Sequence, residues 1–76
     1  MPTEIRAEMV AQVHSVLVEP GNPVTAGDTL VLLESMKMEI PVLAEAGGVV
    51  VHVHVVAGDV VYEGDVLVTL RGASSP

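Results

Sequence analysis

The only lysine of this 76-residue chain, Lys37, lies within the stretch Glu34-Ser35-Met36-Lys37-Met38-Glu39. A primary amine can form an amide with an activated carboxylic acid, but a lysine amine in water has a pKa of about 10.4 and is mostly protonated at neutral pH. The sequence supplies no base for this amine, so activation would have to come from another protein. The residue types at this position therefore favour covalent attachment of a group to the chain, and no catalytic residue is predicted.

A plainer interpretation makes Lys37 a solvated side chain on a strand. Side chains alternate between the two faces of a strand, so Met36 and Met38 would then both point into the core. Under the attachment hypothesis, the same two methionines offer soft, adaptable apolar contacts to a modifying enzyme. The sequence leaves these two roles for the methionines open.

Other residues with reactive side chains form weaker patterns. His52 and His54 are two apart and would share one face of a strand, but His14 is the only other histidine, so we expect a solvated outer face and no metal site. The chain has no cysteine, which excludes disulfides and thiolate metal sites. Asp28 and Asp65 fall in separate turns, and both are interpreted as structural.

The formal net charge of −7 argues against binding to nucleic acid or to an anionic membrane surface. The apolar residues are mostly Val, Leu and Ala, and Tyr62 is the single aromatic residue, which disfavours a deep aromatic-lined pocket. No leader segment and no apolar run of spanning length is recognisable, so we expect a cytoplasmic protein.

Short valine-rich and alternating runs separated by Gly, Pro and Asp predict an all-β fold. The runs belong to an internal repeat. Shifting the chain by 37 residues aligns 11–34 with 48–71, and ten of the 24 aligned pairs are identical. These pairs are Val13/Val50, Val16/Val53, Val18/Val55, Gly21/Gly58, Val24/Val61, Gly27/Gly64, Asp28/Asp65, Leu30/Leu67, Val31/Val68 and Leu33/Leu70.

The repeat predicts two similar β units packed about a pseudo-twofold axis, because neither unit could bury its apolar face alone. The chain must turn back after Glu34, whereas the equivalent Arg71 lies near the C-terminus. We therefore expect Lys37 at the tip of a tight hairpin, with both termini at the opposite end. Residues 1–76 should form one domain, with a core over about 4–71 and a flexible tail over 72–76. The repeated turn residues, Gly21, Gly27, Asp28, Gly58, Gly64 and Asp65, should be structural.

The stretch 34–39 resembles the (Glu)-(Ala/Ser)-Met-Lys-Met signature of the biotin/lipoyl attachment family. Residues 18–30 and 55–67 each resemble that family's V-x-x-G-(D/N)-x-V-x-x-G-(D/Q)-x-L pattern, and the resemblance extends over about 4–71. It is closest to small single-domain biotin carboxyl carrier proteins of bacteria, although Ala11 stands where the family commonly has glycine. The resemblance implies a flattened barrel-sandwich of two four-stranded antiparallel sheets.

The resemblance also implies a function. Lys37 would carry biotin attached by a biotin protein ligase, which would recognise the flanking Glu34, Ser35, Met36, Met38 and Glu39. The carrier would then serve a biotin carboxylase and a carboxyltransferase, and would be a monomer when isolated. One alternative is a lipoyl carrier, in which the same fold usually presents Asp-Lys-Ala and lipoate replaces biotin. Another alternative is an unmodified interaction module.

Overall fold

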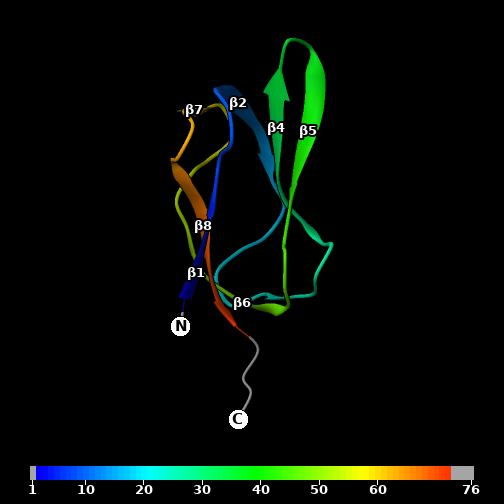
Figure 1. The fold of residues 1–76 in the computed structure, drawn as a ribbon, viewed down its shortest axis with the longest axis vertical. Coiled ribbons are helices and arrows are strands. Elements are labelled where there is room, and N and C mark those ends of the chain that lie inside the picture. Colours follow the sequence, from blue (N-terminus) through cyan, green and yellow to red (C-terminus); the bar gives the residue numbers. More distant parts are fainter. Residues whose placement is uncertain (1, 73–76) are drawn as a thin grey trace.

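The computed structural model describes residues 2–72, which form eight β-strands (Figure 1). That range contains no helix, and therefore none that could cross a membrane. The strands are β1 (Pro2–Arg6), β2 (Ala11–Val16), β3 (Pro23–Val24), β4 (Thr29–Ser35), β5 (Met38–Leu43), β6 (Gly48–Val53), β7 (Val60–Val61) and β8 (Val66–Gly72).

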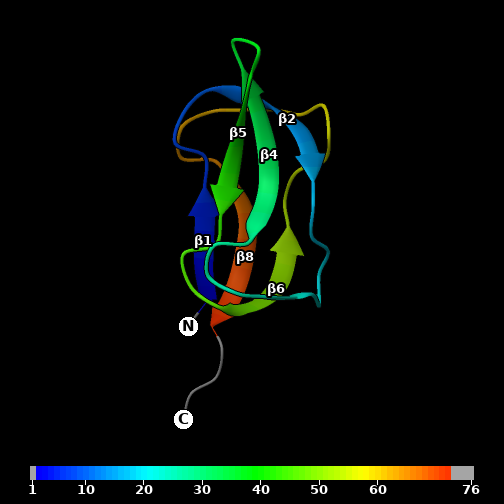
Figure 2. The ribbon, with the colours of Figure 1, turned by 90° about the vertical axis from the view of Figure 1, so that its right-hand side faces the viewer.

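The strands form two four-stranded sheets with the orders β1-β8-β6-β3 and β5-β4-β2-β7. Every pair of neighbouring strands is antiparallel. The sheets pack face to face into an elongated body that measures 42 × 18 × 17 Å along its principal axes (Figures 1 and 2). The predicted flattened barrel-sandwich is therefore confirmed.

A thin core of aliphatic side chains fills the space between the sheets. No large aromatic contributes to it, and no polar or charged residue between 2 and 72 is fully buried. Valine and leucine suit this space because their branched side chains pack well on a pleated surface. The buried residues are Ile5, Ala7, Ala11, Val13, Val24, Leu30, Val31, Leu33, Ala44, Val50, Val55, Val61, Leu67, Val68 and Leu70.

The internal repeat is visible in the strand pairing and extends further than the sequence predicted. The bounds of β2, β3 and β4 become those of β6, β7 and β8 when 37 is added to each residue number. The same shift relates the edge strands, because Ile5 of β1 pairs with Val68 while Val42 of β5 pairs with Val31. The pseudo-twofold axis therefore relates nearly the whole described chain.

The turns repeat as faithfully as the strands. Gly21 and Gly58 have φ values of +95° and +98°, and Gly27 and Gly64 both have +93°, a region that favours glycine. In the turns that follow β3 and β7, a carboxylate three residues further along the chain accepts a backbone hydrogen bond. Asp28 accepts one from the N–H of Thr25, and Asp65 accepts one from the N–H of Tyr62, both at 2.9 Å. These bonds fix the direction in which the chain enters β4 and β8.

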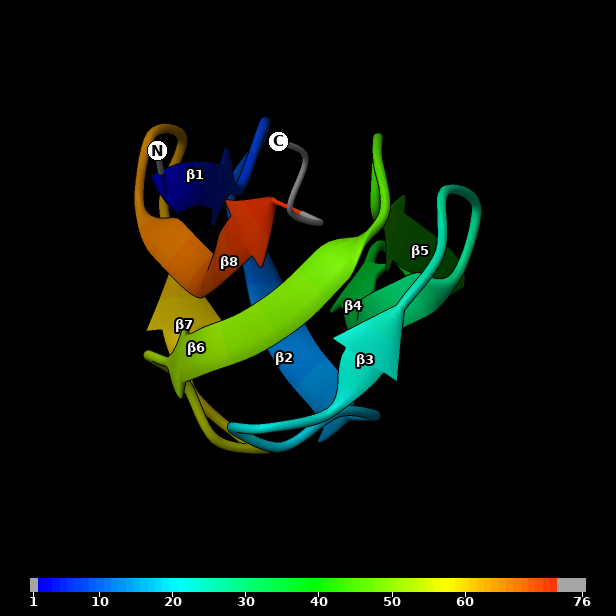
Figure 3. The ribbon, with the colours of Figure 1, turned by 90° about the horizontal axis from the view of Figure 1, so that it is seen from below.

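The two ends of the long axis differ in how the chain is connected. At one end, Ser35 pairs with Met38 and a two-residue turn joins β4 to β5. At the other end, Pro2 of β1 pairs with Arg71 of β8, so the first residue of β1 and the end of β8 lie side by side (Figures 1 and 3). Of the tail expected over 72–76, Gly72 is instead the last residue of β8 and pairs with Gly48. Residues 73–76 lie outside the described range.

At Gly48, the backbone of β6 lies too close to that of β8 to leave room for a side chain. A Cβ atom built on Gly48 would collide with the backbone carbonyl of Arg71, whereas one built on Gly72 would meet nothing within 4 Å. We expect Gly48→Ala to lower the free energy of unfolding by about 1–3 kcal/mol, because strand backbone cannot move aside as a flexible side chain can. Urea denaturation measures the change.

Gly72→Ala is the matched control, and its free energy of unfolding should stay within about 0.5 kcal/mol of wild type. A Gly48→Ala variant as stable as Gly72→Ala would show that β6 and β8 are not in such close contact.

Candidate attachment site

The turn that holds Lys37 has an unusual backbone. Met36 and Lys37 have φ values of 53° and 67°, and within residues 2–72 they are the only non-glycine residues with positive φ. Two positive φ values at the centre of a two-residue hairpin correspond to a type I′ turn, whose twist matches that of the flanking strands. Such turns favour Asn-Gly, and side chains held in this region cost on the order of 1–3 kcal/mol each. The backbone of the hairpin is therefore strained at Lys37, which carries the only lysine amine of the chain.

The side chains of the turn project into solvent. Lys37 is exposed, Met36 retains 91% of its accessible surface and Met38 retains 65%. The interpretation in which both methionines pack into the core is therefore wrong. Alternation between two faces applies to a continuous strand, and the turn interrupts the strand between Ser35 and Met38. The structure leaves both thioether side chains available to a partner.

Two carboxylates lie at the base of the hairpin. Glu34 of β4 pairs directly with Glu39 of β5 across the sheet, an arrangement that destabilises a sheet when both are charged. His14 Nε2 of β2 lies 3.6 Å from Oε2 of Glu39, where a protonated imidazole would offset part of this repulsion. Within residues 2–72 the other ion pair is Arg6 with Glu4, so no described carboxylate holds the Lys37 amine. The acidic pair therefore gains nothing for sheet stability.

All three histidines are exposed. His52 and His54 are exposed, their ring centroids are 5.8 Å apart, and His54 Nε2 lies 2.8 Å from the Thr69 hydroxyl. Residues 2–72 contain no group of three His, Cys, Asp or Glu side chains that could hold a metal ion. His14 lies instead beside the hairpin, a contact that the sequence analysis missed because the two strands involved are not adjacent in the sheet.

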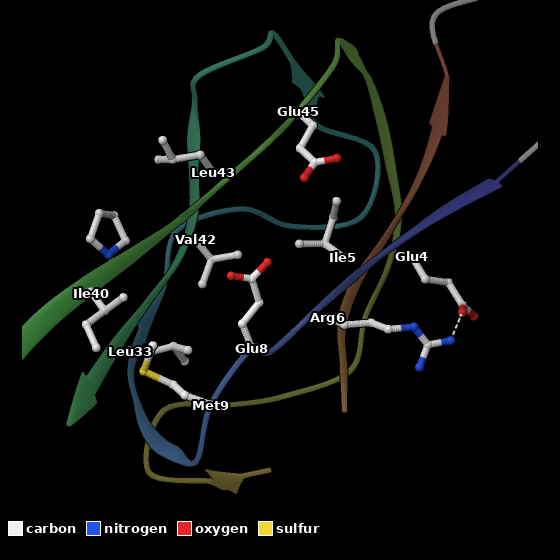
Figure 4. Close-up of a pocket in the computed structure, with 11 residues that line it drawn as sticks. Glu4, Ile5, Arg6, Glu8, Met9, Leu33, Ile40, Val42, Leu43 and Glu45 are labelled. Carbon is white, nitrogen blue, oxygen red and sulfur yellow. Dashed lines mark hydrogen bonds and ion pairs between the residues drawn. The ribbon is translucent and has the colours of Figure 1, made fainter. Parts of the chain in front are cut away.

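A groove of about 430 Å³ separates the edge strands β1 and β5 (Figure 4). Ile5 and Val42, which are equivalent under the repeat, line the groove together with the carboxylates of Glu8 and Glu45. No residue from 34 to 39 contributes to the lining. The attachment site is therefore an exposed tip, and the groove is a separate feature of the scaffold.

Comparison with known proteins agrees with this geometry. The biotin/lipoyl family model, described as "Biotin-requiring enzyme", matches residues 1–70, so the chain belongs to the biotin/lipoyl attachment family. A relative from Mycobacterium leprae, "Biotinylated protein TB7.3 homolog", is 51% identical over 92% of this chain and 99% of its own length.

Solved structures of both carrier types resemble the chain. A single-chain, multi-domain long-chain acyl-CoA carboxylase superposes with a TM-score of 0.88 and 34% identity, over 97% of this chain but 7% of that protein. The lipoyl domain of the 2-oxoglutarate dehydrogenase complex from Azotobacter vinelandii superposes with a TM-score of 0.72 and 32% identity, over 84% of this chain and 82% of that one. The chain thus has the length of a single carrier unit and spans only a small part of the carboxylase.

The strained turn generates a prediction about stability. The double substitution Met36→Asn, Lys37→Gly should raise the free energy of unfolding by about 1–2 kcal/mol, because Asn-Gly adopts the type I′ conformation with little strain. Urea denaturation checks the change. Lys37→Ala alone keeps a Cβ at positive φ and should leave stability within about 0.5 kcal/mol of wild type. A double variant no more stable than Lys37→Ala would show that the native turn is unstrained.

Proposed function

We propose that this chain is a biotin carrier protein and that biotin is attached through an amide bond to Nζ of Lys37. The observation that carries the proposal is the placement of the only lysine on an exposed, strained hairpin tip at one end of a rigid body. The name of the mycobacterial relative, with which the chain shares nearly its full length, supports biotin as the attached group.

The chain contributes the nucleophile and its setting, and a biotin protein ligase contributes the activation. The ligase removes a proton from the Lys37 ammonium, and Nζ attacks the carbonyl carbon of a carboxylic acid that the ligase has activated. An amide bond forms as the nitrogen releases a second proton to water or to a base of the ligase, while the bond to the activating group breaks and that group leaves with the electron pair. The exposed amine needs no rearrangement of the hairpin to reach a ligase. Biotin, once bound, supplies a site that accepts and releases a carboxyl group.

Recognition by the ligase rests on the residues around the amine. Met36 and Met38 offer adaptable apolar contacts, and Ser35 is partly buried where the strand ends. Glu34 and Glu39 form an acidic pair that a basic side chain of the ligase would neutralise. Their mutual repulsion in the free chain makes such a contact more favourable.

The tether explains the carrier role. A group on a flexible arm at the tip of a stiff body stays at high effective concentration near two partner sites. We propose that those partners are a biotin carboxylase, which uses ATP and bicarbonate, and a carboxyltransferase. The similarity to a multi-domain acyl-CoA carboxylase supports this choice. The proposal describes a monomeric, cytoplasmic carrier with no catalytic residue of its own.

A lipoyl carrier is the second candidate, favoured by the similarity to a lipoyl domain. The two Met residues that flank Lys37 argue for biotin, because lipoyl domains usually present Asp-Lys-Ala by the resemblance described above. The two candidates and an unmodified interaction module differ in one observable, which is the adduct on Lys37.

Mass spectrometry of protein from its native cell tests the proposal. Wild type should carry one adduct with the mass of biotin on Lys37, and it should bind streptavidin. Lys37→Arg keeps the positive charge and should abolish the adduct while leaving the unfolding midpoint unchanged, because the side chain is exposed. An adduct with the mass of lipoate, or a native chain without any adduct, would overturn the biotin assignment.

Met36→Asp tests the role of the exposed methionine. We expect the rate of biotinylation at low chain concentration to fall about tenfold, because a third negative charge at the tip replaces an apolar contact. Leu17→Asp is the matched control, since Leu17 is also exposed, at 54%, and lies away from the hairpin. Both variants should unfold within about 0.5 kcal/mol of wild type. Equal biotinylation rates for the two variants would contradict a recognition role for Met36.

A further inference from the structure

The pseudo-twofold axis relates the two ends of the molecule, which have equivalent backbone structure. The side chains that each end carries can therefore be compared directly. At the lysine end, the N–H of Ala7 donates to Asp65 O and the N–H of Gly64 donates to Ala7 O, both at 2.9 Å. At the opposite end, the equivalent bonds run from the N–H of Ala44 to Asp28 O and from the N–H of Gly27 to Ala44 O, both at 2.8 Å. Both ends therefore have the same pattern of backbone hydrogen bonds.

The exposed side chains at the two ends nevertheless differ. The lysine end carries Val10, Val60 and Tyr62, which are 57%, 57% and 59% exposed. The equivalent positions at the other end are Gly47, Pro23 and Thr25. Since glycine, proline and threonine fit the equivalent backbone, folding does not require the valine and tyrosine side chains at the lysine end. Tyr62 is also the only aromatic residue of the chain, and it lies outside the core.

The three residues lie on the outer side of the sheet at or beside β7 and the start of β2, and β2 separates β7 from the hairpin strand β4. Ala11 and Val61 pair with each other and are both buried, so their sequence neighbours Val10, Val60 and Tyr62 point outward. We call these three residues the apolar shelf.

A single row of residues connects the shelf to the hairpin. Gln12 of β2 pairs with Val60 on one side and with Glu34 on the other, and Glu34 pairs in turn with Glu39. The row therefore crosses the whole sheet, from the edge strand β7 to the edge strand β5, just below the lysine turn. An exposed apolar group continuous with a candidate recognition surface is typical of a protein interface, and tyrosine is among the residues enriched at binding hot spots.

We propose that the apolar shelf is a docking surface for the biotin protein ligase, an inference that rests on the proposed function. In the ligase reaction the reacting atom is Nζ of Lys37 itself, so the ligase must close around the hairpin. The hairpin projects beyond the rest of the chain in Figure 2, and a partner that encloses it will rest on the adjoining shelf. A carboxylase instead acts at the far end of the arm and can remain further from the body.

The surface also defines the chemistry of its partner. The shelf is apolar, Glu34 and Glu39 lie further along the same row as Val60, and the exposed Glu63 follows Tyr62 in the sequence, so acidic residues accompany the shelf. A complementary ligase surface would hold an apolar patch for the shelf, with lysine or arginine side chains at its rim. Steering by these charges would speed association at low ionic strength.

The test compares two triple variants as substrates of a biotin protein ligase. Val10→Thr, Val60→Thr, Tyr62→Thr removes the apolar surface of the shelf. Leu17→Thr, Val49→Thr, Val56→Thr removes exposed apolar surface of similar size elsewhere, from residues that are 54%, 42% and 65% exposed. We expect the shelf variant to raise the KM for the carrier about tenfold or more with kcat within about twofold of wild type, and the control variant to change neither.

Direct binding provides a readout that is independent of the reaction. The Lys37→Arg chain, which cannot be biotinylated, should bind the ligase, and adding the shelf substitutions should weaken that binding by about the same factor as the KM rises. Circular dichroism should show equal unfolding midpoints for both triple variants.

The outcomes separate this inference from the proposed function. A wild-type chain that gains no biotin would overturn the proposed function and the shelf with it. A wild-type chain that is biotinylated, with an unchanged KM for the shelf variant, would overturn the shelf alone. A shelf variant that is biotinylated normally but carboxylated slowly by a biotin carboxylase would also overturn the ligase assignment.

Discussion

Each sheet of this molecule takes its two central strands from one half of the chain and its two edge strands from the other half. Backbone hydrogen bonds join the two halves of the chain. The N–H of Gly21 donates to Val50 O and the N–H of Gly58 donates to Val13 O, both at 2.8 Å. Neither half can complete a sheet or cover its apolar face alone. The halves must therefore fold together, and a core without large aromatics suffices because it is shared.

This interlocking explains how a strained turn can persist at the tip. A hairpin of two strands is marginally stable by itself, but β4 is a central strand that β2 and β5 hold on both sides. The scaffold therefore determines the conformation of Met36 and Lys37 in spite of the cost of positive φ. The result is an amine whose position is fixed at its Cα while its side chain stays free in solvent, which suits a group that must reach several partners.

The sequence predicted the features that the repeat and its turns impose. Paired glycines and aspartates aligned 11–34 with 48–71, and from that alignment followed the twofold, the hairpin tip and the adjacent termini. The equivalence of β1 with β5 escaped prediction because residues 2–6 and 39–43 share no identical pair. An edge strand has only one neighbour and so constrains its side chains less than a central strand does.

Side-chain placement at the site was harder to predict than the fold. The sequence left open whether Met36 and Met38 pack into the core or stay available to a partner, and the structure exposes both at the hairpin with positive φ. His14 and Glu39 come from β2 and β5, which lie on either side of β4. No local sequence pattern predicts a contact between these two strands. Such contacts depend on register and twist, which require the assembled sheet.

Comparison of the two pseudo-symmetric halves shows which side chains the fold requires and which positions can vary. Buried positions repeat closely, with Leu30 and Leu67 both fully buried and Val13 and Val50 both 1% exposed, because the two halves share one core. Exposed positions diverge, and they do so at opposite ends of a 42 Å axis. One end carries the amine and the larger apolar side chains, whereas the other brings the termini together. Since both termini lie away from the lysine, a unit of this kind can be joined to other domains without obstructing its tip. That geometry accounts for the similarity of the chain both to a small separate protein and to 7% of a multi-domain carboxylase.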